Sequence, residues 1–230
     1  MVVVNAGAHS LYLAHQMGYG LDFGQLPVAG SFYKANKRIL KGKVYMVQNP
    51  KLPVAALHGD PDVVLNDNTR FGPTALVLPK LERFRSGTYL DFFYTLRLDM
   101  NIVKIFMDLL KDKGIRNYIF RNFLFEIPYF GKKAFIKDAR KIVPSLQESD
   151  IEYADGFGGV RAQILDKKNQ KLILGEASID TGEGIIFNMT PSPGATSCLG
   201  NAKRDIALIC EYLSKNFDNE RLENDLEESN

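Results

Sequence analysis

The sequence lacks any long apolar run, and this absence excludes a membrane-spanning helix. No stretch of about 18 uncharged apolar residues occurs in the 230-residue chain. The start of the chain also lacks a basic segment followed by an apolar one, so we expect no export signal. Because 45% of the residues are apolar and neither repeats nor low-complexity stretches occur, the composition is typical of a globular protein with a substantial core.

Cysteine is scarce, and its placement excludes an internal disulfide. Cys198 and Cys210 both fall on the helix expected near the end of the chain. Twelve residues of helix separate them by about 18 Å, whereas a disulfide needs Cα atoms within about 7 Å. We therefore expect two reduced thiols in a cytoplasmic protein, and their spacing does not indicate a metal site.

The net charge of +2 is small but unevenly distributed. The last 13 residues, 218–230, hold six acids and one arginine, which leaves +7 on the rest of the chain. We expect this acidic tail to be solvated and frayed. The basic excess elsewhere suits acidic substrates or anionic lipid, but it is too weak to indicate nucleic-acid binding.

The first four residues form a wholly apolar run typical of a buried parallel strand. A turn at 5–8 follows, and then a helix expected from near Ser10. The apolar positions expected on its inner side are Leu11, Leu13, Ala14 and Met17. Because a buried parallel strand has neighbours on both edges, either this is an edge strand or the chain is the C-terminal part of something longer, and we favour the second interpretation.

Four further apolar runs predict the strands of an open, meandering sheet. They cover 27–33, 44–47, 54–58 and 75–78. Turn-forming residues at 59–62 and at 72–73 separate them.

A helical block is expected from about 89 to 143. One of its helices is expected to end at Gly114, and its apolar face holds Ile102, Val103, Phe106, Leu109 and Leu110. Within 116–135 aromatic residues alternate with cations. We prefer to interpret them as core aromatics beside solvated charges, and the alternative is a surface that enters a lipid headgroup layer.

Strands return at 159–165, 172–179 and 185–189, and an amphipathic helix follows. Its apolar positions step by three and four: Leu199, Ala202, Ile206, Ile209 and Leu213. Two prolines and Gly194 precede this helix, whose free N–H groups could hold negative charge on a ligand. The local pattern alone favours a plain strand-to-helix turn.

Several short segments occur in a family-specific order. They read VVNAGAHS at 3–10, PVAGSFY at 27–33, LHGDP at 57–61, RFGPTAL at 70–76, GGVRAQ at 158–163 and PSPGAT at 191–196. Together they resemble malate:quinone oxidoreductases, which are FAD enzymes of the D-amino-acid-oxidase group of glutathione-reductase-like flavoproteins. L-2-hydroxyglutarate dehydrogenases look similar through the same segments.

The resemblance implies a mixed α/β (α+β) fold. In it, 1–26 and 151–217 are the remainder of a glutathione-reductase-like FAD-binding domain, 27–150 is an inserted substrate domain with a mixed sheet and helices, and 218–230 is the acidic tail. Members of the family begin with a βαβ unit carrying Gly-x-Gly-x-x-Gly, which holds the FAD pyrophosphate. This sequence has no such motif, so it resembles only the C-terminal half of the enzyme.

The resemblance also implies roles for individual residues. His58 is the expected base for the substrate hydroxyl, or else a histidine that closes a turn. Arg161 is the preferred carboxylate clamp, and Arg70 is either a second clamp or a solvent-facing arginine. The expected FAD contacts are Gly7, Ala8, Gly159, Pro193, Gly194, Ala195 and Thr196.

The implied activity is oxidation of (S)-malate to oxaloacetate through FAD, with electrons passed to a membrane quinone. The protein would then lie on the inner face of the cytoplasmic membrane, with 118–135 as the contact, and a separate N-terminal half could complete it. Two alternatives stay open: an L-2-hydroxyglutarate dehydrogenase-like enzyme, and a truncated, non-catalytic fragment.

Overall fold

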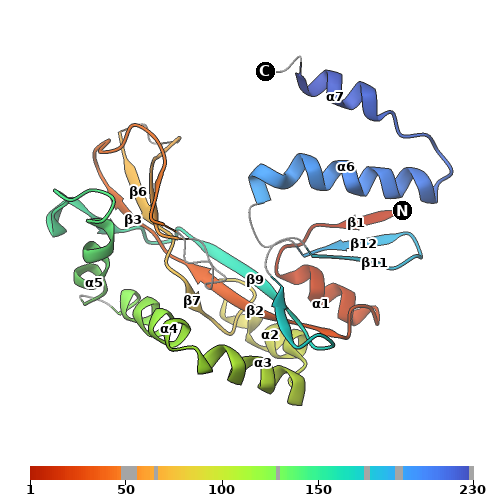
Figure 1. Cartoon of the computed structure of the whole chain (residues 1–230), viewed down its shortest axis with the longest axis horizontal. Coiled ribbons are helices and arrows are strands. Elements are labelled where there is room, and N and C mark those ends of the chain that lie inside the picture. Colours follow the sequence, from red (N-terminus) through yellow and green to blue (C-terminus); the bar gives the residue numbers. More distant parts are fainter. Residues whose placement is uncertain (48–55, 65–66, 128–129, 174–176, 190–193, 228–230) are drawn as a thin grey trace.

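The computed structural model describes the whole chain except residues 48–55, 65–66, 128–129, 174–176, 190–193 and 228–230. The fold is mixed α/β, as the sequence predicted. In the described residues the strands form sheets of three, four and five strands. Figure 1 shows them following one another along the long axis, with α2, α3 and α4 at the lower side and α6 at the opposite side.

The three-stranded sheet joins the two ends of the chain. Its order is β1 (Val2–Val4), β12 (Ile185–Asn188) and β11 (Ser178–Asp180), and β1 runs parallel to β12. The parallel strand at the start of the chain is therefore confirmed, but the burial expected for it is not: β1 lies at an edge of this sheet, and Val2 is 55% exposed. Helix α1 (His9–Gln16) packs on the sheet through Leu11 and Ala14, which share a core with Phe187.

Leu13 and Met17, which we expected on the inner side of α1, are exposed. The prediction was wrong for these two residues because α1 buries only a narrow face. That face also includes Ser10 and His15.

The four-stranded sheet is antiparallel throughout. Its order is β10 (Lys171–Ile173), β9 (Gly159–Asp166), β2 (Phe23–Gly30) and β7 (Leu76–Val77). Strands β2 and β9 pair over their full length. Strand β2 crosses the expected domain boundary at residue 26, and it pairs with a strand that lies beyond residue 150. This sheet therefore combines strands from both expected domains. The limits of the two domains stay a prediction.

Helices α2 (Tyr89–Leu96) and α3 (Met100–Lys111) contribute the side chains that pack on this sheet. Phe92, Leu96, Ile102 and Ile105 are buried in one cluster with Leu165 of β9. A short 3-10 turn, η1 (Ser86–Thr88), leads into α2.

The five-stranded sheet carries the rest of the predicted strands. Its order is β4 (Val44–Tyr45), β5 (His58–Pro61), β6 (Thr69–Gly72), β3 (Tyr33–Ala35) and β8 (Glu152–Tyr153), the last preceded by η2 (Glu148–Asp150). Helices α4 (Lys113–Phe125) and α5 (Phe130–Ala139) complete its core, where Tyr33 stacks on Phe135 with ring centroids 4.2 Å apart.

Two expectations about these strands were wrong. The predicted strands divide between two sheets, and residues 59–61, expected as part of a turn, belong to β5. The cross-strand pairing of Asp60 with Arg70 and of Pro61 with Thr69 outweighs the local turn preference.

The helical block is confirmed, but its internal boundary is not where the sequence placed it. Helix α3 ends at Lys111, and Asp112 begins α4 by accepting hydrogen bonds from the backbone N–H groups of Gly114 and Ile115. Gly114 therefore lies in the first turn of α4. An N-terminal carboxylate cap stabilises a new helix here and overrides the glycine stop signal.

The aromatic residues of 116–135 fall into two groups. Phe125 and Phe135 are buried, as the preferred interpretation requires, whereas Phe120, Phe123 and Phe130 are exposed. Tyr129 lies outside the described residues.

Helix α6 (Gly194–Tyr212) is confirmed, but its expected apolar positions Leu199, Ala202 and Ile206 are exposed, and so is Leu213, which follows the helix. The acidic tail, expected to be frayed, includes α7 (Asn219–Glu227), which Asp218 caps at the N–H of Arg221. Neither Cys198 nor Cys210 forms a disulfide with a described residue. No helix in the described ranges combines the length and the apolar character needed to cross a bilayer.

Candidate active site

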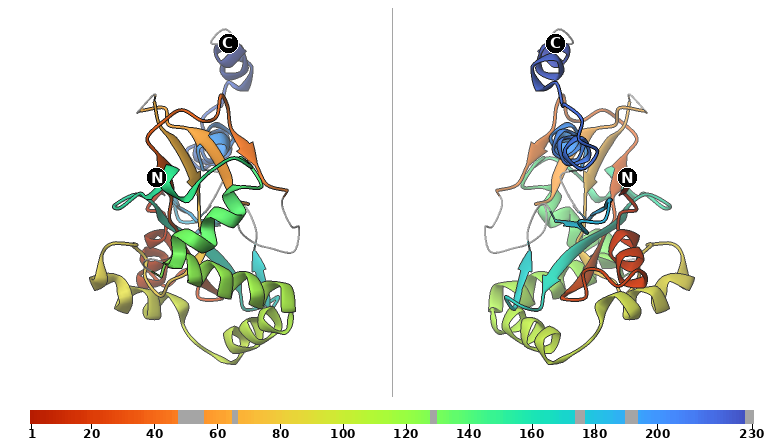
Figure 2. Two further views of the ribbon diagram at one scale, coloured as in Figure 1. Left: turned by 90° about the vertical axis from the view of Figure 1, so that its left-hand side faces the viewer. Right: turned by 90° about the vertical axis from the view of Figure 1, so that its right-hand side faces the viewer.

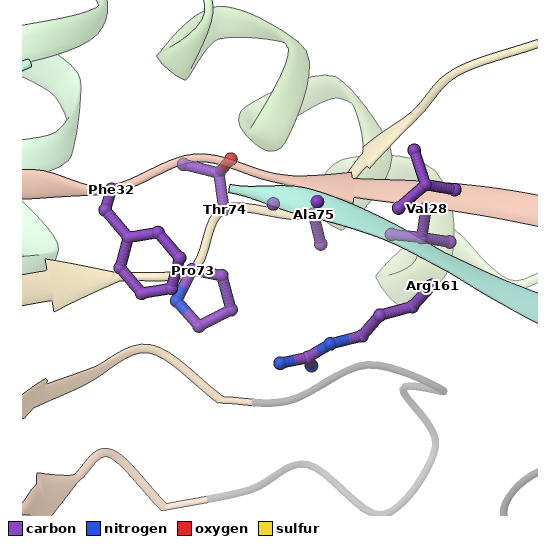
Figure 3. Close-up of a pocket in the computed structure, with 9 residues that line it drawn as sticks. Val28, Phe32, Pro73, Thr74, Ala75 and Arg161 are labelled. Atoms are coloured by element: carbon purple, nitrogen blue, oxygen red, sulfur yellow. The ribbon is translucent and has the colours of Figure 1, made fainter. Parts of the chain in front are cut away.

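A pocket of about 110 Å³ lies where β2 ends and β9 begins (Figure 3). Beyond β2 the chain bends into β3, and a cis peptide bond joins Gly72 to Pro73 at the end of β6. Gly158 permits the close approach of these segments, since a Cβ at this position would lie 2.0 Å from the carbonyl oxygen of Gly30. The pocket is lined by Val28, Gly30, Phe32, Pro73, Thr74, Ala75, Gly159, Val160 and Arg161.

Arg161 is the charged residue of this lining. Figure 3 shows its side chain extended away from β9 on the same side as Pro73. Burial lowers the pKa of Arg161 below its ordinary value. Among the described residues its guanidinium makes no hydrogen bond and no ion pair. A half-buried cation without an internal counter-ion is a favourable place for an anionic ligand.

Three side chains from other elements lie close enough to Arg161 to interact with it electrostatically. They are Tyr118 of α4, Tyr45 of β4 and His58 of β5. Burial raises the pKa of Tyr118 to about 12, so this phenol stays neutral and can donate a hydrogen bond. The structure thus brings His58 and Arg161, which are far apart in the sequence, to one region.

His58 is buried against Tyr45, with ring centroids 4.9 Å apart. Burial lowers the pKa of His58 and outweighs the opposing hydrogen bond to Ala56, while Arg161 lowers it further. Nδ1 lies 3.2 Å from the carbonyl oxygen of Ala56, which can only accept, so Nδ1 carries the proton. The neutral imidazole therefore leaves Nε2 with a free lone pair.

Arg70 differs from Arg161 because its charge is already balanced. Its Nη2 donates to Asp60 Oδ2 at 2.9 Å, and its Nε lies 3.6 Å from Asp62 Oδ2. The register places Arg70 opposite Asp60, and His58 lies two residues before Asp60 on the same strand. These three side chains consequently share one face of the five-stranded sheet. Arg70 is therefore not a solvent-facing arginine without partners, and it is not part of the pocket lining.

A largely buried polar network supports the pocket wall, and no sequence pattern indicated it. Glu126, at the end of α4, accepts from Ser31 Oγ at 2.6 Å, from Thr74 Oγ1 at 2.7 Å and from Arg83 Nη2 at 2.9 Å. Tyr153 of β8 also contacts Arg83, at 3.1 Å. Since Thr74 lines the pocket, this network fixes one wall. Ser31, Thr74 and Arg83 lie 95, 52 and 43 residues from Glu126, and Tyr153 lies 27 residues from it, so no local motif identifies the network.

The expected FAD contacts lie in two places. Gly159 lines the Arg161 pocket. Gly7 and Ala8 follow β1, while Gly194, Ala195 and Thr196 begin α6 after β12; Pro193 lies outside the described residues. Because β1 and β12 are parallel neighbours, the segments that follow them both begin at the carboxyl ends of the strands, on the same side of the sheet.

Polar side chains fasten these two segments together. Asn188 Nδ2 donates to Asn5 Oδ1 at 2.9 Å and to Asp205 Oδ2 of α6 at 2.5 Å. No interaction in the described part of the chain links Gly7 or Ala8 directly to Arg161. The juxtaposition of the β1 and β12 turns is therefore resolved, and their role in cofactor binding stays a prediction.

Comparison with known proteins identifies the family. The family model described as malate:quinone oxidoreductase (Mqo) matches residues 1–228. The chain belongs to the malate:quinone oxidoreductase family. This confirms the resemblance drawn from the short segments.

Curated members of the family are close in sequence. The chain is 61% identical over 98% of its length to a probable malate:quinone oxidoreductase of Campylobacter jejuni, and 57% identical over 98% to a malate:quinone oxidoreductase of Helicobacter pylori strain 26695. In both cases it spans about half the length of the relative, 50%.

A more distant relative is the L-2-hydroxyglutarate dehydrogenase of Indibacter alkaliphilus, 28% identical over 86% of this chain and 46% of the relative. The ranking of these relatives favours malate:quinone oxidoreductase over L-2-hydroxyglutarate dehydrogenase, as the sequence segments did.

Proposed function

We propose that this chain supplies the substrate-binding half of an FAD-dependent malate:quinone oxidoreductase. The whole enzyme would oxidise (S)-malate to oxaloacetate and pass the electrons to a membrane quinone. The observation that carries this proposal is Arg161, a half-buried cation without a partner among the described residues, in a pocket near a neutral histidine.

Arg161 would hold a carboxylate of the substrate. The planar guanidinium matches the two oxygens of a carboxylate, and burial strengthens the interaction because little solvent screens it. The phenol of Tyr118, neutral at physiological pH, could orient a second substrate oxygen. This residue was not predicted from the sequence.

His58 would remove the proton of the substrate hydroxyl. Its lowered pKa keeps the imidazole neutral, and the hydrogen bond from Nδ1 to Ala56 presents Nε2 as the basic atom. The resulting imidazolium would be stabilised by Asp60, whose carboxylate raises the pKa of His58. Arg70 holds that carboxylate in place, which gives Arg70 an indirect role unless it releases Asp60 to bind substrate.

The residues present fit FAD at the positions where backbone must approach a flat ring or a phosphate. A Cβ at Gly7 or Gly159 would meet nothing within 4 Å, so both backbones are open to a ligand. Gly7, Ala8, Gly159, Pro193, Gly194, Ala195 and Thr196 would hold the cofactor. When bound, FAD would supply the acceptor for the hydride that leaves the substrate carbon.

The rest of the enzyme would come from the half that this chain does not span. We propose that it carries the dinucleotide-binding βαβ unit and packs against the open edge of β1 and the exposed apolar positions of α6. The complete enzyme would lie at the inner face of the cytoplasmic membrane, where it reaches its quinone.

A chimera tests the proposal. The part of the Campylobacter jejuni relative that this chain does not cover is joined to residues 1–230 and purified. We expect a yellow protein absorbing near about 450 nm, as any oxidised flavin does, that reduces a soluble acceptor dye with malate. A colourless chimera that stays inactive with added FAD would overturn the proposal and favour a non-catalytic fragment.

The same chimera separates malate from 2-hydroxyglutarate as the substrate. If Arg70 is a malate-specific clamp, exchanging it for Ala lowers activity on malate more than on 2-hydroxyglutarate. Equal losses would mean that Arg70 acts through Asp60 and the fold.

A further inference from the structure

Helices α3 and α4 each carry a series of exposed apolar and basic residues, and we call the two series together the outer stripe. Spacings of three and four place its members on one side of each helix. The apolar members are strongly exposed: Met100 (79%), Met107 (56%), Phe120 (64%) and Phe123 (53%). The basic members alternate with them and are Lys104, Lys111, Lys113 and Arg116.

The outer stripe is not the unfilled core of this chain. The opposite side of α3 is already packed, with Ile102 and Ile105 buried under the four-stranded sheet. On α4, Phe125 is buried in the core of the five-stranded sheet. The inner face of each helix is thus packed in a core, while its outer face still exposes Met or Phe side chains. Large exposed apolar side chains are unfavourable unless a partner covers them.

The net charge of this surface is positive. Residues 100–125 hold five Lys or Arg and two Asp, for a net charge of +3. The two acids are occupied, because Asp108 pairs with Lys111 and Asp112 caps α4. Positive charge therefore surrounds the exposed Met and Phe.

This composition favours a lipid surface over a protein partner. Lysine is depleted in the cores of protein interfaces, whereas basic residues interleaved with Phe and Met suit anionic headgroups above an acyl layer. Under the proposed function, the half of the enzyme that this chain does not span would bind elsewhere, at β1 and α6. Figures 1 and 2 show these two elements on the side of the molecule opposite α3 and α4.

We propose that the outer stripe seats the protein on an anionic bilayer, with Met100, Met107, Phe120 and Phe123 entering the headgroup layer. The inference deepens the proposed function, on which it rests, since a membrane quinone must be reached from a bound position. It also revises the contact expected at 118–135: Phe125 and Phe135 are core residues, and α3 takes their place.

Sedimentation with vesicles tests this surface on the purified chain, without substrate or cofactor. We expect binding to vesicles that contain phosphatidylglycerol, little binding to pure phosphatidylcholine, and weaker binding at high salt. The double variant Lys104→Glu/Lys113→Glu should bind more than tenfold more weakly, since each cation near such a surface contributes about 1 kcal/mol. The double variant Phe120→Ser/Phe123→Ser should also lose most of the binding.

Matched controls isolate the position of the stripe from net charge and from exposed apolar area. Lys41→Glu/Lys215→Glu makes the same charge change elsewhere, and Leu199→Ser/Ile206→Ser removes apolar side chains from α6. Both should bind within about twofold of the wild type. Circular dichroism verifies that every variant is folded.

The proposal is overturned if the chain does not sediment with phosphatidylglycerol vesicles, or if the controls weaken binding as much as the stripe variants. It is also overturned if the stripe variants bind vesicles normally but fail to assemble with the other half. Malate oxidation by the chimera with a soluble dye is measured separately, so failure of the lipid surface is distinguishable from failure of the enzyme assignment.

Discussion

Two arginines near the candidate site show how the surroundings of a cation separate a role in binding from a role in stability. Arg70 donates to Asp60 and lies near Asp62, so its charge is balanced inside the fold. Arg161 is half-buried in a pocket, and no described side chain balances it. The described fold gains little from a cation in that position, and this is the reason for our proposal that a ligand supplies the counter-ion.

The largest expected effect is on activity at Arg161. In the chimera, Arg161→Met should lower kcat/KM for malate by about 100-fold or more, since losing one partner of a desolvated charge pair costs about 2–5 kcal/mol. The melting temperature should stay equal or rise, because the variant removes a partly buried charge that no described side chain balances. Arg161→Lys is the control and should recover part of the activity. If Arg161→Met lowers the melting temperature but keeps its activity on malate, Arg161 has the stabilising role that we assign to Arg70, and the contrast between the two arginines is wrong.

The next effect concerns the network that supports the pocket wall. Glu126→Ala should lower the free energy of unfolding by about 3 kcal/mol, because it leaves the buried Arg83 without its carboxylate. Glu126→Gln should cost less, since the amide can still accept from Ser31 or Thr74. Urea unfolding of the chain measures both. A loss below about 1 kcal/mol for Glu126→Ala would mean that the network is not a main support.

Arg70 should behave oppositely to Arg161. Arg70→Met should lower the free energy of unfolding by about 1–2 kcal/mol, discounted from the cost of a fully buried pair because Arg70 is 29% and Asp60 15% exposed. Pairing Arg70→Met with Asp60→Asn in a double-mutant cycle isolates the interaction. If Arg70→Met leaves stability unchanged while Arg161→Met reduces it, the distinction between the two arginines fails.

The smallest expected effect is the pH dependence of kcat/KM that His58 causes. Burial lowers the pKa of His58 in the folded state from its ordinary 6.5. The neutral form is favoured, so activity and the related stability are complete above pH 6.5 and are lost as pH falls through the lowered value.

The pH profile of kcat/KM in the chimera should therefore show an acid limb with its midpoint below 6.5. The limb should vanish in His58→Gln along with most of the activity. His15 has a pKa lowered by burial too and lies outside the pocket, so His15→Gln is the control for acid effects on the fold. A midpoint above 6.5 would contradict the neutral, buried assignment.

Much of the secondary structure could be read from the sequence, because it depends on local periodicity. The strand at the start of the chain, the helical block and α6 all formed as the spacing indicated, whereas α7 formed in a tail that we expected to be frayed. The boundaries at 59–62 and at Gly114 could not be read, since cross-strand pairing at Asp60 and capping by Asp112 decided them.

The candidate site divides in the same way. His58, Arg161 and Gly159 were named from short segments, whereas Tyr45, Tyr118 and the Glu126 network were not. These side chains reach the site from separate strands and helices. Neither their residue types nor their spacings in the sequence identify them as neighbours of the pocket.

The sequence by itself determined the family, the mixed α/β class and the residue types available for chemistry, because short motifs and apolar periodicity are properties of neighbouring residues. Only the tertiary structure decided which charges are already balanced. It placed Arg70 beside two carboxylates, whereas no carboxylate of the described residues balances Arg161 in its pocket. The reason is that charge compensation depends on distances between side chains that are remote in the chain.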